Sequence, residues 1–242
     1  AGERKGFLTW LAGCEADVVA LQEIKAAPEQ LSAALRAPAG YHAHWLPAQR
    51  PGYSGVATLS CAAPLEVRRG LGDPRFDAEG RVLVTRFPAF TLFNVYVPSG
   101  TTGPERVAFK LDFTAALREA LRAELEAGRS LVVVGDLNTA YAEIDLARPR
   151  ENQRTSGFMP EERAALGELF AIGLVDSFRH LHPTAVKYSW WTQRAGARER
   201  NVGWRLDYIL VSRDLAPHIV AADTHPEVTG SDHCPVSVEL AL

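Results

Sequence analysis

The sequence predicts an α/β protein in which layered β-sheets pack together and helices lie on the outside. Short β-branched runs recur along the chain, and the helical segments between them are too few to follow every strand. The runs at 81–87 and 91–97 are joined by a short Pro-Ala-Phe connection. Such a connection predicts a hairpin and disfavours a strictly alternating parallel sheet.

The expected strands follow from apolar, β-branched composition, and several read as buried on both faces. They lie at 17–21, 56–59, 81–87, 91–97, 131–134, 206–211 and 236–240. The clearest helix spans 104–127, where apolar residues repeat at i+4, Pro104 occupies the first turn and Gly128 provides the stop. Shorter helices are expected at 3–11, 28–36 and 160–172.

Composition bounds the class of protein. The 242 residues are 47% hydrophobic and 23% charged, without repeats or a linker, so we expect one domain over residues 1–242. The longest apolar runs fall far short of the roughly 20 residues that cross a bilayer. The formal net charge of −3 argues against a surface that is basic all over, as many nucleic-acid-binding proteins have.

Cysteine usage and the start of the chain bear on location. Cys14, Cys61 and Cys234 are widely spaced and form no CxxC pair, which points to a reducing compartment. Together with Ala- and Arg-rich usage this favours a bacterial cytoplasm, or the nucleus if the source is eukaryotic. The chain begins without Met and shows no signal peptide, so we expect a trimmed N-terminus.

Polar side chains placed directly after buried strands carry the chemical signal, because a rigid strand aims them. Glu23 follows the apolar run 18–21, and Asp136 and Asn138 follow the run 131–134. Carboxylate and amide oxygens are ligands that Mg²⁺ prefers. Taken singly, a solvated strand end at Glu23 and an Asx-turn at Asp136 remain open as alternatives.

Three further places repeat this pattern. Asp207 stands at the head of an apolar strand, where it would orient a histidine or pair with a neighbouring arginine. Asp232 and His233 are adjacent in a turn bounded by Gly and Pro, which suits metal ligation or acid–base work. Asn94 and Tyr96 share one strand face, although a lone buried tyrosine is more often a core residue.

Together these residues predict an oxygen-rich, negatively charged site with one imidazole. Such a site recruits a divalent cation, and for Mg²⁺ the usual substrate is a phosphate ester. The chain has no GxxxxGK[ST] loop, no GxSxG elbow and no Cys/His cluster. Nucleoside triphosphatases of the P-loop class, serine hydrolases and structural zinc sites are therefore disfavoured.

In their order and spacing, the motifs resemble those of the exonuclease III family of apurinic/apyrimidinic (AP) endonucleases. They are LQEIKA (21–26), GYSGVATLS (52–60), EGR (79–81), NVYVPSG (94–100), GDLNTAYAEIDL (135–146), NVGWRLDYIL (201–210) and GSDHCPV (230–236). GDLN and GSDHCP are shared with a wider superfamily of metal-dependent phosphodiesterases and phosphatases. NVGWRLDY, with Trp-Trp upstream, narrows the match to the DNA-repair branch.

The resemblance implies a DNase I-like four-layer α/β sandwich, with two mixed sheets face to face and helices outside. It implies hydrolysis of the phosphodiester 5′ to an abasic site, leaving a 3′-hydroxyl, with 3′→5′ exonuclease, 3′-phosphatase and 3′-phosphodiesterase activities in addition. The cofactor implied is Mg²⁺, or Mn²⁺ in its place. The partner implied is double-stranded DNA with abasic sites or blocked 3′ ends, bound by a monomer with no membrane association.

Residue roles also follow from the resemblance. Glu23 corresponds to the principal Mg²⁺ ligand, and Asp136 to the residue that orients or deprotonates the attacking water, with Asn138 stabilising the pentacovalent phosphate. His233 would bind a phosphate oxygen while held by Asp207, and Tyr96 would contact the phosphate or assist the leaving oxygen. The metal set expected is Glu23, Asp136, Asn138, Asp232 and His233.

An abasic nucleotide has no base edge to read, so a pocket that accepts a flipped sugar must provide selection. The resemblance assigns this pocket to Trp190, Trp204 and Leu206, for which core packing is the alternative. The loop 193–201 resembles the segment that enters the duplex. The DNA-contacting residues expected are Arg148, Arg150, Asn152, Arg154, Arg194, Arg198 and Arg200.

The chain departs from the family pattern at its start. The family begins with a strand carrying Trp-Asn-x-Asn-Gly, and here residues 1–7 already resemble the helix that follows that strand. We expect that first strand to be absent from this sequence. Ser99 and Thr102 stand where some relatives carry amide or basic side chains, which leaves the balance of endonuclease and exonuclease activity open.

Two other functions remain as hypotheses. One is a phosphatase or phosphodiesterase of the same superfamily that acts on a small molecule or a lipid head group. The other is a non-catalytic DNA-binding relic.

Overall fold

The computed structural model describes residues 6–242, which form two compact units. The first unit ends at Tyr96 and the second runs from Val97 to Leu242. The prediction of a single domain over residues 1–242 stays a prediction. Within the described residues, no helix combines the length and apolar character that crossing a membrane requires.

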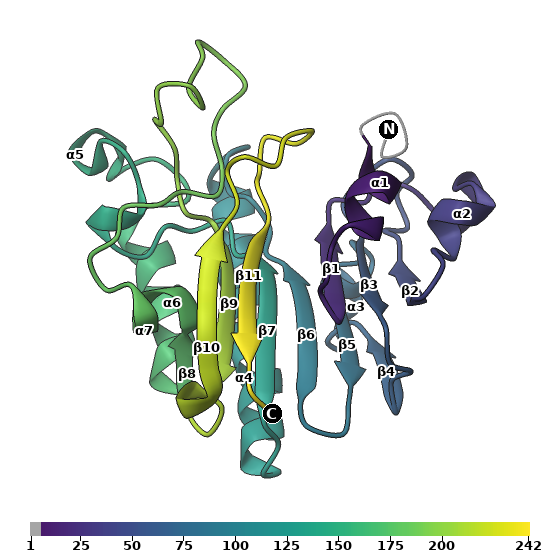
Figure 1. Ribbon diagram of the computed structural model, residues 1–242. Helices are drawn as coiled ribbons and strands as arrows, with labels where there is room; N and C mark the ends of the chain where they lie inside the picture. Colours follow the sequence, from purple (N-terminus) through teal and green to yellow (C-terminus); the bar gives the residue numbers. More distant parts are fainter. Residues whose placement is uncertain (1–5) are drawn as a thin grey trace. The chain divides into compact units, whose positions relative to one another are not determined.

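The first unit is built of short strands and helical turns (Figure 1). Its helices are α1 (Phe7–Ala12), the 3₁₀ turn η2 (Pro28–Gln30), α2 (Ala33–Arg36) and α3 (Pro74–Asp77). Its strands are β1 (Val18–Gln22), β2 (His42–Leu46), β3 (Val56–Ser60), β4 (Glu66–Arg69), β5 (Val82–Arg86) and β6 (Thr91–Tyr96).

Two sheets pack face to face in the first unit. β3 lies between β1 and β2, and β5 lies between β4 and β6, with every pair antiparallel. Val56 packs against Leu83 and Tyr96 of the second sheet. Leu59, which points to the opposite face, packs against Leu11 of α1. The order of layers is therefore helix, sheet, sheet.

The second unit contains the longer elements (Figure 1). Its strands are β7 (Leu131–Asp136), β8 (Leu174–Asp176), β9 (Asp207–Ser212), β10 (Ile219–Thr224) and β11 (Val236–Leu240). Its helices are α4 (Pro104–Glu126), η3 (Glu143–Asp145), α5 (Pro149–Asn152), α6 (Pro160–Ala171), α7 (Ser177–Leu181) and η4 (Ala216–His218).

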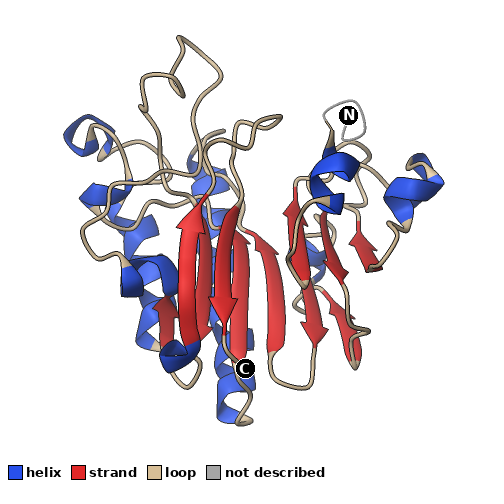
Figure 2. Cartoon of the chain, in the orientation of Figure 1, coloured by secondary structure: helices blue, strands red, loops and turns tan. Residues whose placement is uncertain are grey.

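The second unit is layered as well. β9 lies between β7 and β8, and the hairpin of β10 and β11 packs on it through β11. α4 and α6 pack on each other and on β7 and β8, on the face away from the hairpin (Figure 2). Phe113, Leu117 and Leu121 form the fully buried stripe of α4, as the i+4 repeat predicts.

The predicted strands all form, with ends that differ by one or two residues, and the predicted hairpin is confirmed by the antiparallel pairing of β5 and β6. The strands β2, β4, β8 and β10 were not expected, because they are short, polar or only half-buried. The helix expected at 28–36 is wrong as one element: Ser32 caps a separate α2 after the 3₁₀ turn. The helix expected from Glu3 begins at Phe7, and residues 3–5 lie outside the described residues.

The α4 stripe generates a stability prediction. Leu121→Ala should lower the free energy of unfolding by about 2 to 5 kcal/mol, because it leaves a cavity under a side chain that is 0% exposed. Leu65→Ala is the control, since Leu65 is 63% exposed and its loss should cost less than about 0.5 kcal/mol. Urea unfolding followed by circular dichroism measures both, and equal losses would contradict the packing described.

Candidate active site

The pairing of β7 with β9 places two carboxylates opposite each other. The register runs from Val132 opposite Val211 to Asp136 opposite Asp207, so the last residue of β7 faces the first residue of β9. Both aspartates are buried, with exposed fractions of 5% and 9%. Like charges directly opposite on neighbouring strands repel, so a third group has to compensate them.

His233 provides that compensation. Its Nδ1 lies 2.9 Å from Oδ2 of Asp207. A bridge between His233 and Trp190, and the bond from the Cys234 amide to the Ser189 carbonyl, hold the turn that carries the ring. The alternative of an arginine partner for Asp207 is not what the structure has, since the neighbouring Arg205 pairs with other aspartates.

The protonation states follow from burial and these charges. Burial raises the pKa of Asp136 to about 7, with the charge of His233 opposing the rise and that of Asp207 adding to it. Burial acts to lower the pKa of His233, but the charge and hydrogen bond of Asp207, helped by Asp136 and Asp232, raise it to about 10. At neutral pH a protonated imidazole therefore lies near a carboxyl group that can accept a proton.

Asn138 is fixed beside Asp136 by a tight turn. Its φ of 49° is left-handed, a conformation that asparagine tolerates better than most residues. Its backbone N–H donates to Asp136 Oδ1 (2.8 Å), and its Nδ2 donates to Asp136 Oδ2 (3.0 Å) and to the Val97 carbonyl (2.9 Å). The Asx-turn that the sequence left open as an alternative therefore forms, and it is this turn that brings the Asn138 side chain against the Asp136 carboxylate.

In the first unit, Glu23 and Tyr96 form a second polar group. The Tyr96 hydroxyl donates a short hydrogen bond to Glu23 Oε1, and the Lys25 ammonium lies 2.9 Å from Oε2. Glu23 has a left-handed φ of 52°, an uncommon conformation for this residue type. Such strained residues gather at functional sites.

Arg81 secures Tyr96 in the first unit; in the sequence it stands in the EGR motif (79–81), where no role was assigned to it. Only 2% of it is exposed. It donates to the Tyr96 carbonyl (3.0 Å) and the Tyr53 hydroxyl (3.1 Å), and its guanidinium carbon lies 4.5 Å from the centre of the Tyr96 ring. The signal in the sequence is a charged residue directly before the buried run of β5.

The predicted pocket residues Trp190, Trp204 and Leu206 come together in the second unit. The rings of Trp190 and Trp204 meet edge to face at 6.5 Å, and Phe158 meets Trp204 in the same way at 6.4 Å. Trp191 points elsewhere and packs in a separate cluster with Tyr188. The two adjacent tryptophans therefore face different sides, as the alternation of a strand requires.

The predicted DNA-contacting residues fall into two groups. Arg148, Arg150, Arg154, Arg194 and Arg200 are exposed. Arg198 is instead engaged within the protein: it donates to the carbonyls of Ser231, Pro226 and Val228 and stacks on Trp191. Asn152 donates its side-chain amide to the Arg148 carbonyl.

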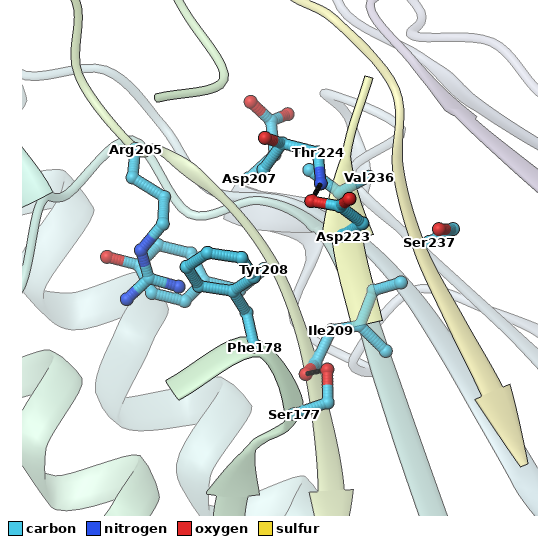
Figure 3. A pocket seen from close by; sticks show the side chains of 10 residues that line it. All are labelled: Ser177, Phe178, Arg205, Asp207, Tyr208, Ile209, Asp223, Thr224, Val236 and Ser237. Atoms are coloured by element: carbon cyan, nitrogen blue, oxygen red, sulfur yellow. Dashed lines mark hydrogen bonds between the residues drawn. The ribbon is translucent and has the colours of Figure 1, made fainter. Parts of the chain in front are cut away.

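A buried ion-pair network centred on Arg205 was not expected from the sequence. Figure 3 shows Arg205 beside Tyr208, among the residues that line a pocket next to β9. Arg205 donates to Asp145 Oδ1 (2.8 Å) and Asp176 Oδ2 (2.7 Å), and its guanidinium carbon lies 4.4 Å from the centre of the Tyr208 ring. These partners raise the pKa of Arg205 against the effect of burial. The network holds Arg205 and Tyr208, which flank Asp207 in the sequence.

The donor chemistry fits a hard divalent cation. Within residues 6–242, His, Cys, Asp and Glu form no cluster of three or more that could hold a metal by itself. Glu23 Oε2 nevertheless has a cation as its neighbour, the Lys25 ammonium, and both side chains are about half exposed, at 44% and 52%. In the second unit, burial raises the pKa of Asp136 because the ionised carboxylate is costly away from water, and a bound cation would offset that cost.

The His233 pairing generates a prediction in the metal-free protein. Nitrogen-15 NMR should find the imidazole protonated well above pH 7, and Asp207→Asn should lower its pKa. Because the folded pKa lies above that of the unfolded chain, His233 stabilises the fold fully below about pH 6.5, and this contribution is lost as the pH rises through about 10.

A matched control exists on the same strand–turn segment. Asp214 bonds Ser130 and does not contact His233, so Asp214→Asn should leave the His233 titration where it is. An identical titration curve in Asp207→Asn and in the unsubstituted protein would contradict the pairing.

The chain is similar in sequence and in structure to proteins that are already known. Residues 2–233 match the model of the Endonuclease/Exonuclease/phosphatase family. The chain is 41% identical over 233 residues to the Exodeoxyribonuclease of Bacillus subtilis (strain 168), covering 96% of this chain and 91% of that protein. It is 40% identical over 242 residues to the DNA repair nuclease APEX1 of Danio rerio, covering 99% and 78%. The structure of an AP endonuclease from Archaeoglobus fulgidus matches with a TM-score of 0.88 at 28% identity, over 97% and 93% of the two chains.

These similarities extend over nearly the whole chain, and they confirm the predicted α/β fold class and the resemblance that the motifs carry. The chain belongs to the endonuclease/exonuclease/phosphatase family, in its exonuclease III branch, and is a hydrolase of the nuclease class.

Proposed function

We propose that the chain is a Mg²⁺-dependent DNA-repair nuclease that hydrolyses the phosphodiester 5′ to an abasic site and leaves a 3′-hydroxyl. The observation that carries the proposal is the charge arrangement of Asp136, Asp207 and His233 in the unit that also holds the aromatic cluster. The names of the matching nucleases support it. The proposal includes 3′→5′ exonuclease, 3′-phosphatase and 3′-phosphodiesterase activities on blocked 3′ ends.

In the proposed reaction, Asp136 orients the attacking water and accepts its proton. A carboxyl group with a pKa of about 7 suits a general base near neutral pH. His233 donates from Nε2 to a non-bridging phosphate oxygen, while its Nδ1 stays on Asp207. The Asn138 amide stabilises the negative charge of the pentacovalent phosphate. We assign Tyr96, in the first unit, a contact to the phosphate or to the leaving oxygen.

The metal ligands we propose are oxygen donors. They are Glu23 in the first unit, and Asp136, Asn138 and Asp232 in the second. Bound Mg²⁺ would polarise the phosphate and neutralise its developing charge. His233 belongs to the expected set as well: with its Nδ1 on Asp207, its Nε2 is the atom that would face a metal or a phosphate oxygen.

Selection of the abasic nucleotide is assigned to the cluster of Trp190, Trp204 and Leu206. Aromatic walls admit a flipped sugar and reject a nucleotide that still carries its base. Phosphate contacts along the duplex are assigned to the exposed arginines at 148, 150, 154, 194 and 200. We further propose that the protein acts as a monomer and is cytoplasmic, and the bacterial source of the exodeoxyribonuclease relative supports the location.

The test is an incision assay on a labelled duplex with one tetrahydrofuran abasic analogue, with Mg²⁺ or with EDTA. We expect incision at the analogue only, in the presence of Mg²⁺ only, and a product end that a DNA polymerase extends. An undamaged duplex and an inositol phosphate are run beside it. Hydrolysis of the inositol phosphate without incision would favour a small-molecule phosphatase, and binding without incision would favour a DNA-binding relic.

Two substitutions test the assigned roles. Asp136→Asn and His233→Ala should each lower the single-turnover incision rate by about 10² to 10⁴, because they remove the proton acceptor and a charged donor to the phosphate. Affinity for the abasic duplex, measured by fluorescence anisotropy, should stay largely intact. A loss of affinity equal to the loss of rate would contradict these roles.

A further inference from the structure

A buried ion pair of the second unit takes no part in the chemistry proposed above. Lys110 of α4 and Glu162 of α6 lie 2.8 Å apart, and their side chains are 2% and 0% exposed. Removing two charges from water is costly, and the cost is recovered only where further hydrogen bonds satisfy both groups. Burial lowers the pKa of Lys110, and Glu162 opposes that shift. The further hydrogen bonds of the two side chains therefore show which parts of the unit the pair holds in place.

The remaining bonds of Lys110 reach the turn that carries Asn138. Its Nζ donates to the Asn138 carbonyl at 2.6 Å. The turn has a left-handed φ at Asn138 and hydrogen bonds to Asp136, so its main chain has little freedom once this carbonyl is held. Lys110 therefore holds the main chain of Asn138, whose side-chain amide bonds Asp136 and Val97.

The remaining bonds of Glu162 reach the segment that contributes Phe158 to the aromatic cluster. Its carboxylate accepts from Ser156 Oγ (2.8 Å), the Gly157 N–H (2.6 Å) and the Met159 N–H (3.2 Å). Phe158 lies between the last two donors and is 0% exposed, edge-on to Trp204. Glu162 thus fixes one wall of that cluster.

Gly157 is where the two fixed segments touch. Its φ is 98°, and a Cβ built on it would lie 3.3 Å from both the Asn138 carbonyl oxygen and the Trp204 ring. The Ala140 N–H donates to the Gly157 carbonyl at 2.8 Å. The segments 138–140 and 156–159 are therefore in direct contact. The ion pair binds both of them, Lys110 through Asn138 and Glu162 through residues 156–159.

We propose that the Lys110–Glu162 pair is a positioning element that sets the discrimination between abasic and intact nucleotides by holding Asn138 and the Phe158 wall in register. The inference rests on the proposed function. Loss of either charge leaves buried donors or a buried carboxylate without a partner, so the two segments shift. A loosened wall admits normal nucleotides, and a displaced Asn138 slows incision.

The variants are Glu162→Gln and Lys110→Met, with Arg118→Met as the matched control. Arg118 and Glu168 join the same two helices at 2.9 Å, but that pair reaches solvent, with exposed fractions of 31% and 59%, and it bonds neither segment. Glu162→Gln keeps the shape of the side chain, so it remains informative if Lys110→Met fails to fold. Melting curves identify the temperature at which all variants tested are folded.

The readout is a ratio: kcat/KM for incision at the tetrahydrofuran analogue, divided by kcat/KM for 3′→5′ degradation of an undamaged duplex. A merely structural loss lowers both terms together and leaves the ratio unchanged. We expect Glu162→Gln and Lys110→Met to lower the ratio by about tenfold, mainly because the loosened wall raises kcat/KM on the undamaged duplex, whereas displacement of Asn138 lowers both terms and leaves the ratio unchanged. Arg118→Met should give the ratio of the unsubstituted chain.

A second arm uses Trp204→Ala, which opens the cluster directly. In that background Glu162→Gln should change the ratio no further, because the wall it holds no longer closes the pocket. An unchanged ratio in Glu162→Gln, or a full additional loss in the Trp204→Ala background, would overturn this inference alone. Absence of incision by the unsubstituted chain would instead overturn the proposed function and the inference with it.

Discussion

The opposed carboxylates of Asp136 and Asp207, with the imidazolium of His233, are the constraint on which the second unit's site depends. Their positions are fixed by the β7–β9 register, and a slip of one residue would exchange the side chains that β7 packs on its two covered faces. The carboxylates therefore cannot separate, and a positive charge has to accompany them. The same constraint sets the protonation states: burial raises the pKa of Asp136 to about 7, while the imidazole of His233 keeps its proton at neutral pH.

Charge compensation continues behind this group. Arg205 joins Asp145 of η3 to Asp176 at the end of β8, and Arg179 adds a second bond to Asp145. These interactions bring three segments distant in sequence against the start of β9. Glu162 and Lys110 do the same for the segments around Asn138 and Phe158. Polar interactions, in addition to apolar packing, hold the loops in place above the layered core.

The elements that could be predicted from the sequence are those whose apolar residues repeat with the spacing of a strand or a helix. The strands with apolar residues on successive positions and the i+4 stripe of α4 are visible because burial imposes the pattern. β2 and β4 carry polar residues at sheet edges, and β8 has three residues, so neither period nor composition reveals them. Asp136 and Asp207 could be placed at strand ends from the sequence, because the apolar runs beside them mark the strands. Arg198 and Lys110 resemble surface residues in the sequence, since nothing local reveals which distant carbonyl each one binds.

The formal net charge of −3 says little about how charge is distributed over the molecule, because some of the acidic side chains are paired inside it. Several acids are occupied by internal partners: Asp145, Asp176 and Glu162 by buried cations, and Asp207 by His233. Trp190 shows why the remaining polar chemistry and the aromatic cluster belong together. It bridges Trp204 and His233 through its main chain, and its indole N–H donates to Asp232. Trp190 therefore couples the aromatic cluster to the imidazole of His233, and a change in one is transmitted to the other; under the proposed function, sugar recognition and phosphate positioning would share this residue.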